Sequence, residues 1–117
     1  MDRSKAGAEI LKKLFNEDSG PEERGFAAHT RDYLFGEIWT RPGLALQERS
    51  MITCAVLAAL GREPQLRGHL GGALNIGIPA EKLEEMLLHV THYAGWPAGS
   101  TGVRVLKDVV AERSGKR

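Results

Sequence analysis

MITCAVLAAL, residues 51–60, is a stretch of ten residues without a charged side chain. It would span nearly three turns of helix, and a helix that is apolar all round must be covered on every side. In a chain of 117 residues, we expect such a helix to lie in the core, at a subunit interface, or both. Polar and aromatic residues precede it in GEIWTRPGL, residues 36–44, so we expect any chemistry near the ends of this apolar helix.

The other segments also carry helical patterns. Apolar residues within 3–15 fall on one face of a helix, and no segment alternates with the period of a strand. Prolines and glycines divide the chain, because proline suits the first turn of a helix and glycine suits its end. We therefore predict helices at about residues 3–15, 21–38, 46–60, 64–76, 79–94 and 99–113.

The predicted fold is all-α, with about six helices in a single domain that spans residues 1–117. The third and fourth helices are joined by so few residues that they should form a central antiparallel hairpin. That hairpin places residues 37–49 at the end away from Gly61, and it places His69 roughly two turns along the returning helix. We expect a pocket between the fourth helix, residues 37–49 and the break at Gly95-Trp96-Pro97.

Charge, hydropathy and cysteine content exclude several classes of protein. The net charge of +1 gives no electrostatic reason to expect nucleic-acid binding. No apolar run approaches the roughly 20 residues that span a bilayer, and the N-terminus lacks the apolar core of a signal peptide. A single cysteine excludes an internal disulfide and a two-thiol redox motif. We expect a cytoplasmic protein that contacts neither membrane nor nucleic acid.

Two features could be taken for reactive or metal-binding sites. Glu85, His89 and His92 share one helical face, a spacing that metal ligation can use. That face lies opposite the apolar stripe of its helix, so we interpret it as solvated and expect no metal. Cys54 lies inside the apolar helix, where a cysteine behaves as a small buried hydrophobe.

Many spaced residues carry a resemblance to a known family. They are residues 36–44, Arg49-Ser50, Thr53, Ala59-Leu60, Arg62-Glu63, Leu66-Arg67, His69, Ala73-Leu74-Asn75, Gly77, Glu84-Glu85, Tyr93, Gly95 and Pro97-Ala98. Over about residues 7–113 the chain resembles the carboxymuconolactone decarboxylase family, and most closely its branch that acts on 4-carboxymuconolactone. The resemblance implies an AhpD-like fold that assembles into a homo-oligomer, a hexamer or a trimer.

The resemblance also implies a reaction. It is the loss of carbon dioxide from 4-carboxymuconolactone, a lactone dicarboxylate, to give 3-oxoadipate enol-lactone in the β-ketoadipate pathway of aromatic-compound catabolism. The unsaturated lactone carbonyl of the substrate accepts the released electrons, so we expect no cofactor. The protein would bind the anion, stabilise the developing dienolate and protonate carbon.

Seven residues are candidates for these roles, and each also has a plain structural reading. His69 would be the acid-base group and Glu37 its partner or a second proton carrier, while Arg41 or Arg49 would bind a carboxylate. Trp39, Tyr93 and Trp96 would form the wall of the pocket. Otherwise His69 is an interface histidine, Glu37 pairs within its own turn, the arginines make surface contacts, and the aromatic residues belong to the core.

Some residues depart from the pattern of the resembled branch. Pro64-Gln65 stands where an acidic residue is usual, and Trp96, His89 and His92 are also unexpected. These departures leave the fold unchanged and leave the substrate open. The alternatives are a family paralogue that acts on a different carbonyl or lactone substrate, and a non-catalytic oligomer that binds a small ligand.

Overall fold

A computed structural model describes residues 2–18 and 24–115, and it contains helices and no strand within those ranges. The helices are α1 (Arg3–Phe15), α2 (Phe26–His29), a π-helix η1 (Thr30–Ile38), α3 (Leu46–Leu60), α4 (Glu63–Asn75), α5 (Ala80–Ala94) and α6 (Trp96–Arg113). Since α2 continues directly into η1, the chain forms six helical rods. The all-α prediction is confirmed.

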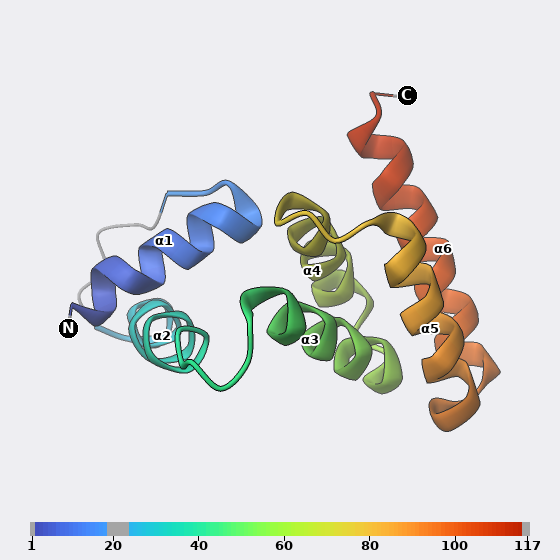
Figure 1. The fold of residues 1–117 in the computed structure, drawn as a ribbon, viewed down its shortest axis with the longest axis horizontal. Helices are drawn as coiled ribbons and strands as arrows, with labels where there is room; N and C mark the ends of the chain where they lie inside the picture. The colour runs from blue at the N-terminus through green and yellow to red at the C-terminus, as the bar shows by residue number, and fades with distance from the viewer. Residues whose placement is uncertain (1, 19–23, 116–117) are drawn as a thin grey trace.

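The rods pack as three successive pairs (Figure 1). α1 lies against η1 at one end, α3 and α4 form the central antiparallel hairpin, and α5 and α6 pack together at the other end. The hairpin turns at Gly61, whose φ of 73° ends α3 in the left-handed conformation that glycine adopts most readily. The predicted central hairpin is therefore confirmed.

Two apolar clusters meet at α4. The larger one joins α3, α4, α5 and α6 through Cys54, Leu66, Leu70, Leu87 and Val105, all of which are essentially inaccessible to solvent. The smaller one joins α1 and η1 and consists of Ile10, Leu14, Phe35 and Trp39. Ile76, just after α4, packs against both clusters. α4 is thus the element that fixes the α1–η1 pair relative to the rest of the chain.

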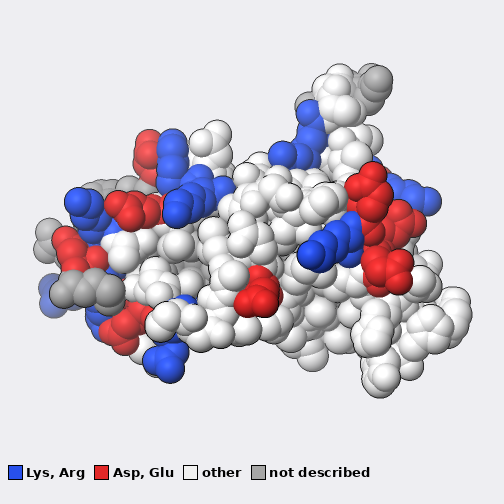
Figure 2. Space-filling model, viewed as in Figure 1, with Lys and Arg blue, Asp and Glu red and all other residues white. Residues whose placement is uncertain are grey.

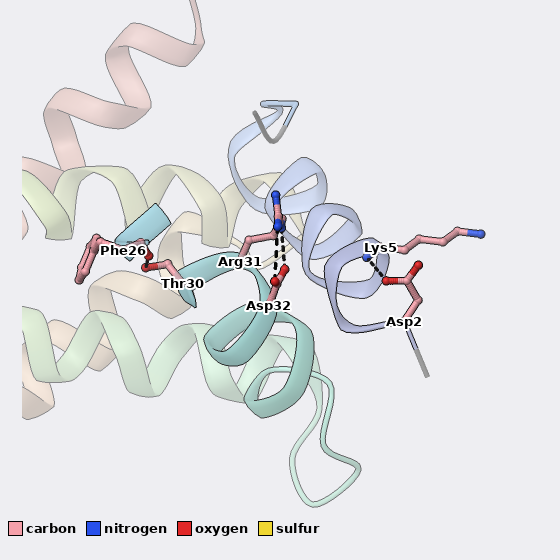
Figure 3. Close-up of polar contacts among 6 residues, drawn as sticks. All are labelled: Asp2, Lys5, Phe26, Thr30, Arg31 and Asp32. Carbon is pink, nitrogen blue, oxygen red and sulfur yellow. Dashed lines mark hydrogen bonds and ion pairs between the residues drawn. The ribbon is translucent and has the colours of Figure 1, made fainter. Parts of the chain in front are cut away.

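The α1–η1 contact depends on close backbone approach. A Cβ atom at Gly36 would overlap the carbonyl oxygen of Arg3, and one at Gly7 would overlap that of Arg31. Polar contacts finish the ends of these helices (Figure 3): Lys5 N donates to Asp2 Oδ1 at 3.1 Å, and Thr30 Oγ1 donates to the Phe26 carbonyl at 2.9 Å.

Figure 3 also shows the ion pair that stabilises the start of η1, in which Arg31 Nε donates to Asp32 Oδ1 at 2.6 Å. The hydrogen bond from Arg31 lowers the pKa of the Asp32 carboxyl group, so this carboxylate stays charged at neutral pH.

The second predicted helix differs from the prediction in its winding. Its residues 21–23 lie outside the described ranges, and from Thr30 onward the structure shows a π-helix instead of an α-helix. The amide of Trp39 donates to the carbonyl of Leu34, five residues back, at 2.9 Å. Because each turn takes more residues than in an α-helix, the buried positions Arg31, Phe35 and Trp39 recur four residues apart along one side.

The break before the last helix is also shorter than predicted. α6 begins at Trp96 and not near Gly99, because Pro97 lies in the first turn of the helix, where its missing N–H costs nothing. Gly95 alone makes the break, with a φ of 109°. α4 ends at Asn75 and its C-cap is Ile76, one residue before the predicted cap at Gly77.

The apolar helix is covered only in part within one chain. Cys54 and Ala58 are buried, but Ile52, Val56 and Leu60, spaced four residues apart, are 50%, 48% and 63% exposed. On the face shown in Figure 2, charged side chains gather at the α1–η1 end and around α5 and α6, with mostly uncharged surface between them. No helix in the described ranges is both long and apolar enough to cross a membrane.

Alanine substitutions at two glycines test the close α1–η1 contact. We expect Gly36→Ala to lower the free energy of unfolding by roughly 1–3 kcal/mol, because the new methyl group overlaps the Arg3 carbonyl. Gly68→Ala is the matched control: nothing lies within 4 Å of its Cβ position, so it should raise stability by up to about 1 kcal/mol. Urea unfolding measures both, and equal effects would contradict the close contact.

Candidate functional site

His69 lies on the side of α4 that faces α1 and η1, on the same helical face as Gly72 and Ile76. Its imidazole lies between two aromatic rings. The Phe15 ring meets it edge-on, with centroids 5.2 Å apart, and the Trp39 ring is nearly parallel to it, at 6.1 Å. Phe15 ends α1 and Trp39 follows η1, so three elements distant in sequence build this site.

The imidazole of His69 is partly buried and under-satisfied. Its Nδ1 atom is inaccessible to solvent and has no hydrogen-bond partner in the described part of the chain. Burial lowers the pKa of His69 below its ordinary value of 6.5, so the ring is neutral at pH 7. Because buried polar atoms without a partner are rare, this nitrogen is a group that a ligand could satisfy.

Arg49 lies in the first turns of α3. Its Nη2 donates to the carbonyl oxygen of Arg41 at 3.1 Å, which joins the guanidinium to the turn before α3. Its Nε is buried and has no partner. The next residue, Ser50, is fully buried with an equally unpartnered hydroxyl. Within the described ranges, the buried side-chain nitrogen and oxygen atoms without partners all belong to the α3–α4 hairpin.

Glu37 has a partner other than His69. Its Oε1 accepts a hydrogen bond from Arg3 Nη1 at 2.8 Å, and both side chains are partly exposed, 39% for Glu37 and 47% for Arg3. No hydrogen bond joins Glu37 to His69 in the part of the chain that the structure describes. Of the two predicted acid-base residues, His69 therefore lies beside the Phe15 and Trp39 rings, while Glu37 pairs with Arg3 at the start of α1.

Tyr93 and Trp96 lie on a different part of the chain from His69. Tyr93 is 83% exposed and stacks on His89, and Trp96 is 64% exposed and meets His92 edge-on, each with centroids 5.1 Å apart. Pro97 shares a groove with Leu60 and Gly61, so the break lies at the Gly61 end of the hairpin. Residues 37–49 lie at the opposite end, and one chain therefore does not form the pocket expected from those segments.

Neither the helical face of Glu85, His89 and His92 nor Cys54 belongs to the candidate site. His89 and His92 are exposed, and no three His, Cys, Asp or Glu residues in the described ranges are grouped to hold a metal. Cys54 is fully buried, and burial raises the pKa of its thiol to about 12, so no reactive thiolate forms at neutral pH.

Phe15 and Ser50 were not among the predicted site residues. Phe15 carries no chemical signal in sequence, because its position depends on how α1 docks on α4. In the sequence, Ser50 is only one of the residues that carry the family resemblance. What marks it in the structure is a hydroxyl group at a fully buried position of an apolar helix, and this burial depends on the fold.

Residues 24–108 match the Carboxymuconolactone decarboxylase family. The chain belongs to this family. It is similar to the 4-carboxymuconolactone decarboxylase of Acinetobacter baylyi, with 44% identity over 77 residues, 66% of this chain and 58% of that protein. It is also similar to the nitrosuccinic acid decarboxylase of Metarhizium robertsii, with 31% identity over 67 residues, 57% of this chain and 47% of that protein. The chain thus spans about half the length of these curated relatives.

The burial of His69 in this carboxymuconolactone decarboxylase family member predicts a pH-dependent stability. Because the folded-state pKa of His69 is lowered, the unfolded chain binds a proton more readily between the two pKa values. The stability contributed by the neutral ring is fully present above the unfolded pKa, near 6.5, and is lost as the pH falls toward the folded pKa. We expect His69→Gln to lose less stability than the parent between pH 8 and about pH 5.5.

Urea unfolding at several pH values measures this difference. The other histidines, His29, His89 and His92, are present in both proteins, so the comparison isolates the contribution of His69. Parallel stability curves for the two proteins would show that His69 is not desolvated as described.

Proposed function

We propose that this chain is a cofactor-independent carboxy-lyase that converts 4-carboxymuconolactone to 3-oxoadipate enol-lactone, in the β-ketoadipate pathway of aromatic-compound catabolism. The observation that carries the proposal is the unpartnered, desolvated imidazole of His69 between Phe15 and Trp39. The 44% identity to a 4-carboxymuconolactone decarboxylase supports this substrate.

The reaction needs little from the protein besides positioning and one proton. As the carbon–carbon bond to the carboxylate breaks, its electron pair flows through the conjugated double bond to the lactone carbonyl, and carbon dioxide leaves. A proton then adds to the α-carbon of the dienolate, which restores the lactone. Two aromatic walls keep water from the developing charge, so a hydrogen bond to the dienolate oxygen is strengthened in the pocket.

His69 suits the acid-base role because its charge depends on what lies in the pocket. Burial lowers its pKa and so favours the neutral ring. A bound dicarboxylate would favour the imidazolium, since an anion within a few ångströms raises the pKa of a histidine. Substrate binding would therefore favour protonation of His69, and the imidazolium could then donate this proton to the α-carbon of the dienolate.

Arg49 is the better placed of the two candidate anchors. It is held by the Arg41 carbonyl, and its buried Nε is free to donate, whereas the Arg41 side chain lies exposed. A guanidinium also fits a carboxylate with two parallel hydrogen bonds. Glu37 would serve as a second proton carrier only by leaving Arg3, and Tyr93 or Trp96 would line this pocket only from another copy of the chain.

A second candidate function is decarboxylation of a different carboxylic acid. The 31% identity to a nitrosuccinic acid decarboxylase favours it, because this similar protein is named for a different substrate. The site would use the same groups, since an anion anchor and a proton carrier serve either acid. A ligand-binding oligomer without catalysis is the remaining alternative.

We further propose that the chain acts as a single cytoplasmic domain within a homo-oligomer, a hexamer or a trimer. The exposed stripe of Ile52, Val56 and Leu60 on α3 supports assembly. Beside that stripe lies an apolar groove of about 340 Å³ between α3 and α5, which includes Val56, Val90 and Tyr93. Large apolar patches of this kind mark interfaces.

Turnover of purified 4-carboxymuconolactone tests the activity. We expect carbon dioxide release without added metal or cofactor, and a loss of about 10²–10⁴-fold in kcat for His69→Gln. Arg49→Met should chiefly raise KM, because it removes an anchor and leaves the proton carrier in place. Product formed in deuterium oxide should carry deuterium on the α-carbon. A fully active His69→Gln protein would contradict the assignment, and nitrosuccinate turnover in place of lactone turnover would favour the second candidate.

Native mass spectrometry tests the assembly. We expect an oligomer for the parent and smaller species for Val56→Glu, because a carboxylate buried at an apolar interface without a partner is strongly disfavoured. Glu84→Gln, on an exposed position of α5, serves as a control outside the α3 stripe. A monomeric parent protein at micromolar concentration would contradict the proposal.

A further inference from the structure

The C-terminal end of α1 docks on α4 one turn beyond His69. Leu14 is fully buried there, and a Cβ atom at Gly72 would lie 3.3 Å from the Leu14 carbonyl oxygen. The ring of Phe15, the next residue, meets the His69 imidazole edge-on. The position of the Phe15 ring therefore depends on where the last turn of α1 is held.

Asn75 holds that last turn from the end of α4. Its Nδ2 donates to the Leu14 carbonyl oxygen at 2.5 Å, across 61 residues of sequence. The last four carbonyl groups of a helix have no partner within the helix, so one of them is free to accept this bond. The carbonyl of Lys12 is taken by the amide of Asn16, which ends α1 in a left-handed conformation.

Arg113, near the end of α6, fixes the orientation of the Asn75 amide. Its Nη1 donates to Asn75 Oδ1 at 2.6 Å. A guanidinium can only donate and a backbone carbonyl can only accept, so the amide oxygen must face Arg113 and its NH₂ group must face Leu14. The contact thus joins the ends of α1, α4 and α6 through one side chain.

We infer that Asn75, oriented by Arg113, is a positioning residue that keeps the Phe15 ring over His69. The inference rests on the proposed function only in taking His69 as the acid-base group. Because Leu14 is fully buried, its carbonyl is shielded from water, and the bond from Asn75 both satisfies that carbonyl and ties it to the end of α4. What it decides is the place of the last turn of α1, and with it the access of water to the imidazole.

The pKa of the His69 imidazole tests whether Asn75 has this positioning role. The rings that face it, Phe15 from α1 and Trp39 after η1, are uncharged, and burial is the one cause that shifts its pKa among the described residues. Water entering beside a displaced Phe15 therefore moves the His69 titration upward, toward 6.5. A purely structural role for Asn75 would change stability and leave that titration unchanged.

Asn75→Leu is the principal test, because it removes the hydrogen bonds at similar size and adds no charge. NMR follows the four histidine rings, and His69 is assigned by the signal missing from His69→Gln. We expect a raised His69 pKa, with kcat about 10- to 100-fold lower and a smaller change in KM, as for a misplaced catalytic group. Arg113→Gln should give a smaller shift in the same direction.

Arg67→Gln is the matched control. Arg67 also joins α4 to α6, through Asp108 at 3.5 Å and Glu112 at 3.4 Å, but it takes no part in the hydrogen bond to α1. It should leave the His69 titration and kcat unchanged. If Asn75→Leu does not fold, Arg113→Gln measured against Arg67→Gln decides the question. An unchanged His69 pKa in the folded variants overturns the inference, whereas absent lactone turnover by the parent protein overturns only the proposed function.

Discussion

The burial of one imidazole nitrogen is the constraint on which the candidate site depends. His69 is partly buried, and the two aromatic rings that contact it come from the end of α1 and from the residue after η1. Neither ring belongs to the hairpin that carries His69, so the N-terminal pair of rods has to be held firmly against α4. The small cluster around Leu14, Phe35 and Trp39 supplies that hold, and the absence of a side chain on Gly7 and Gly36 lets the backbones come close enough. In this way a modest apolar contact between α1 and η1 contributes to the burial that lowers the pKa of the histidine.

The two halves of the chain have different tasks. The α3–α6 half contains the larger core and the exposed apolar stripe, and it contributes the polar atoms of Arg49, Ser50 and His69 that lack partners. The α1–η1 half contributes the aromatic walls. α4 packs against both halves, and Asn75 and Ile76 at its end contact elements on each side, so α4 sets the position of one half relative to the other.

Sequence patterns predicted the helices whose limits are set by local chemistry. The range of α1 was predicted because its apolar residues have a helical period, and the end of α3 was predicted because Gly61 supplies a left-handed cap. The π-helix was not predicted, since the residue pattern indicates a helix but does not distinguish an α-helical turn from the wider π-helical turn. Likewise, the pairing of Glu37 with Arg3 and the contact of Phe15 with His69 join residues 34 and 54 positions apart, and no local signal in the sequence encodes either contact.

The burial of Cys54 has a consequence for how the molecule can be observed. With a thiol pKa near 12 and no exposed surface, this cysteine is shielded from alkylating reagents while α3 and α4 stay together. It is the only thiol in the chain, so its modification has a single origin. The rate at which a small alkylating reagent modifies Cys54 in the native protein therefore measures how often α3 and α4 transiently separate. Cys54 is thus an internal probe of local opening.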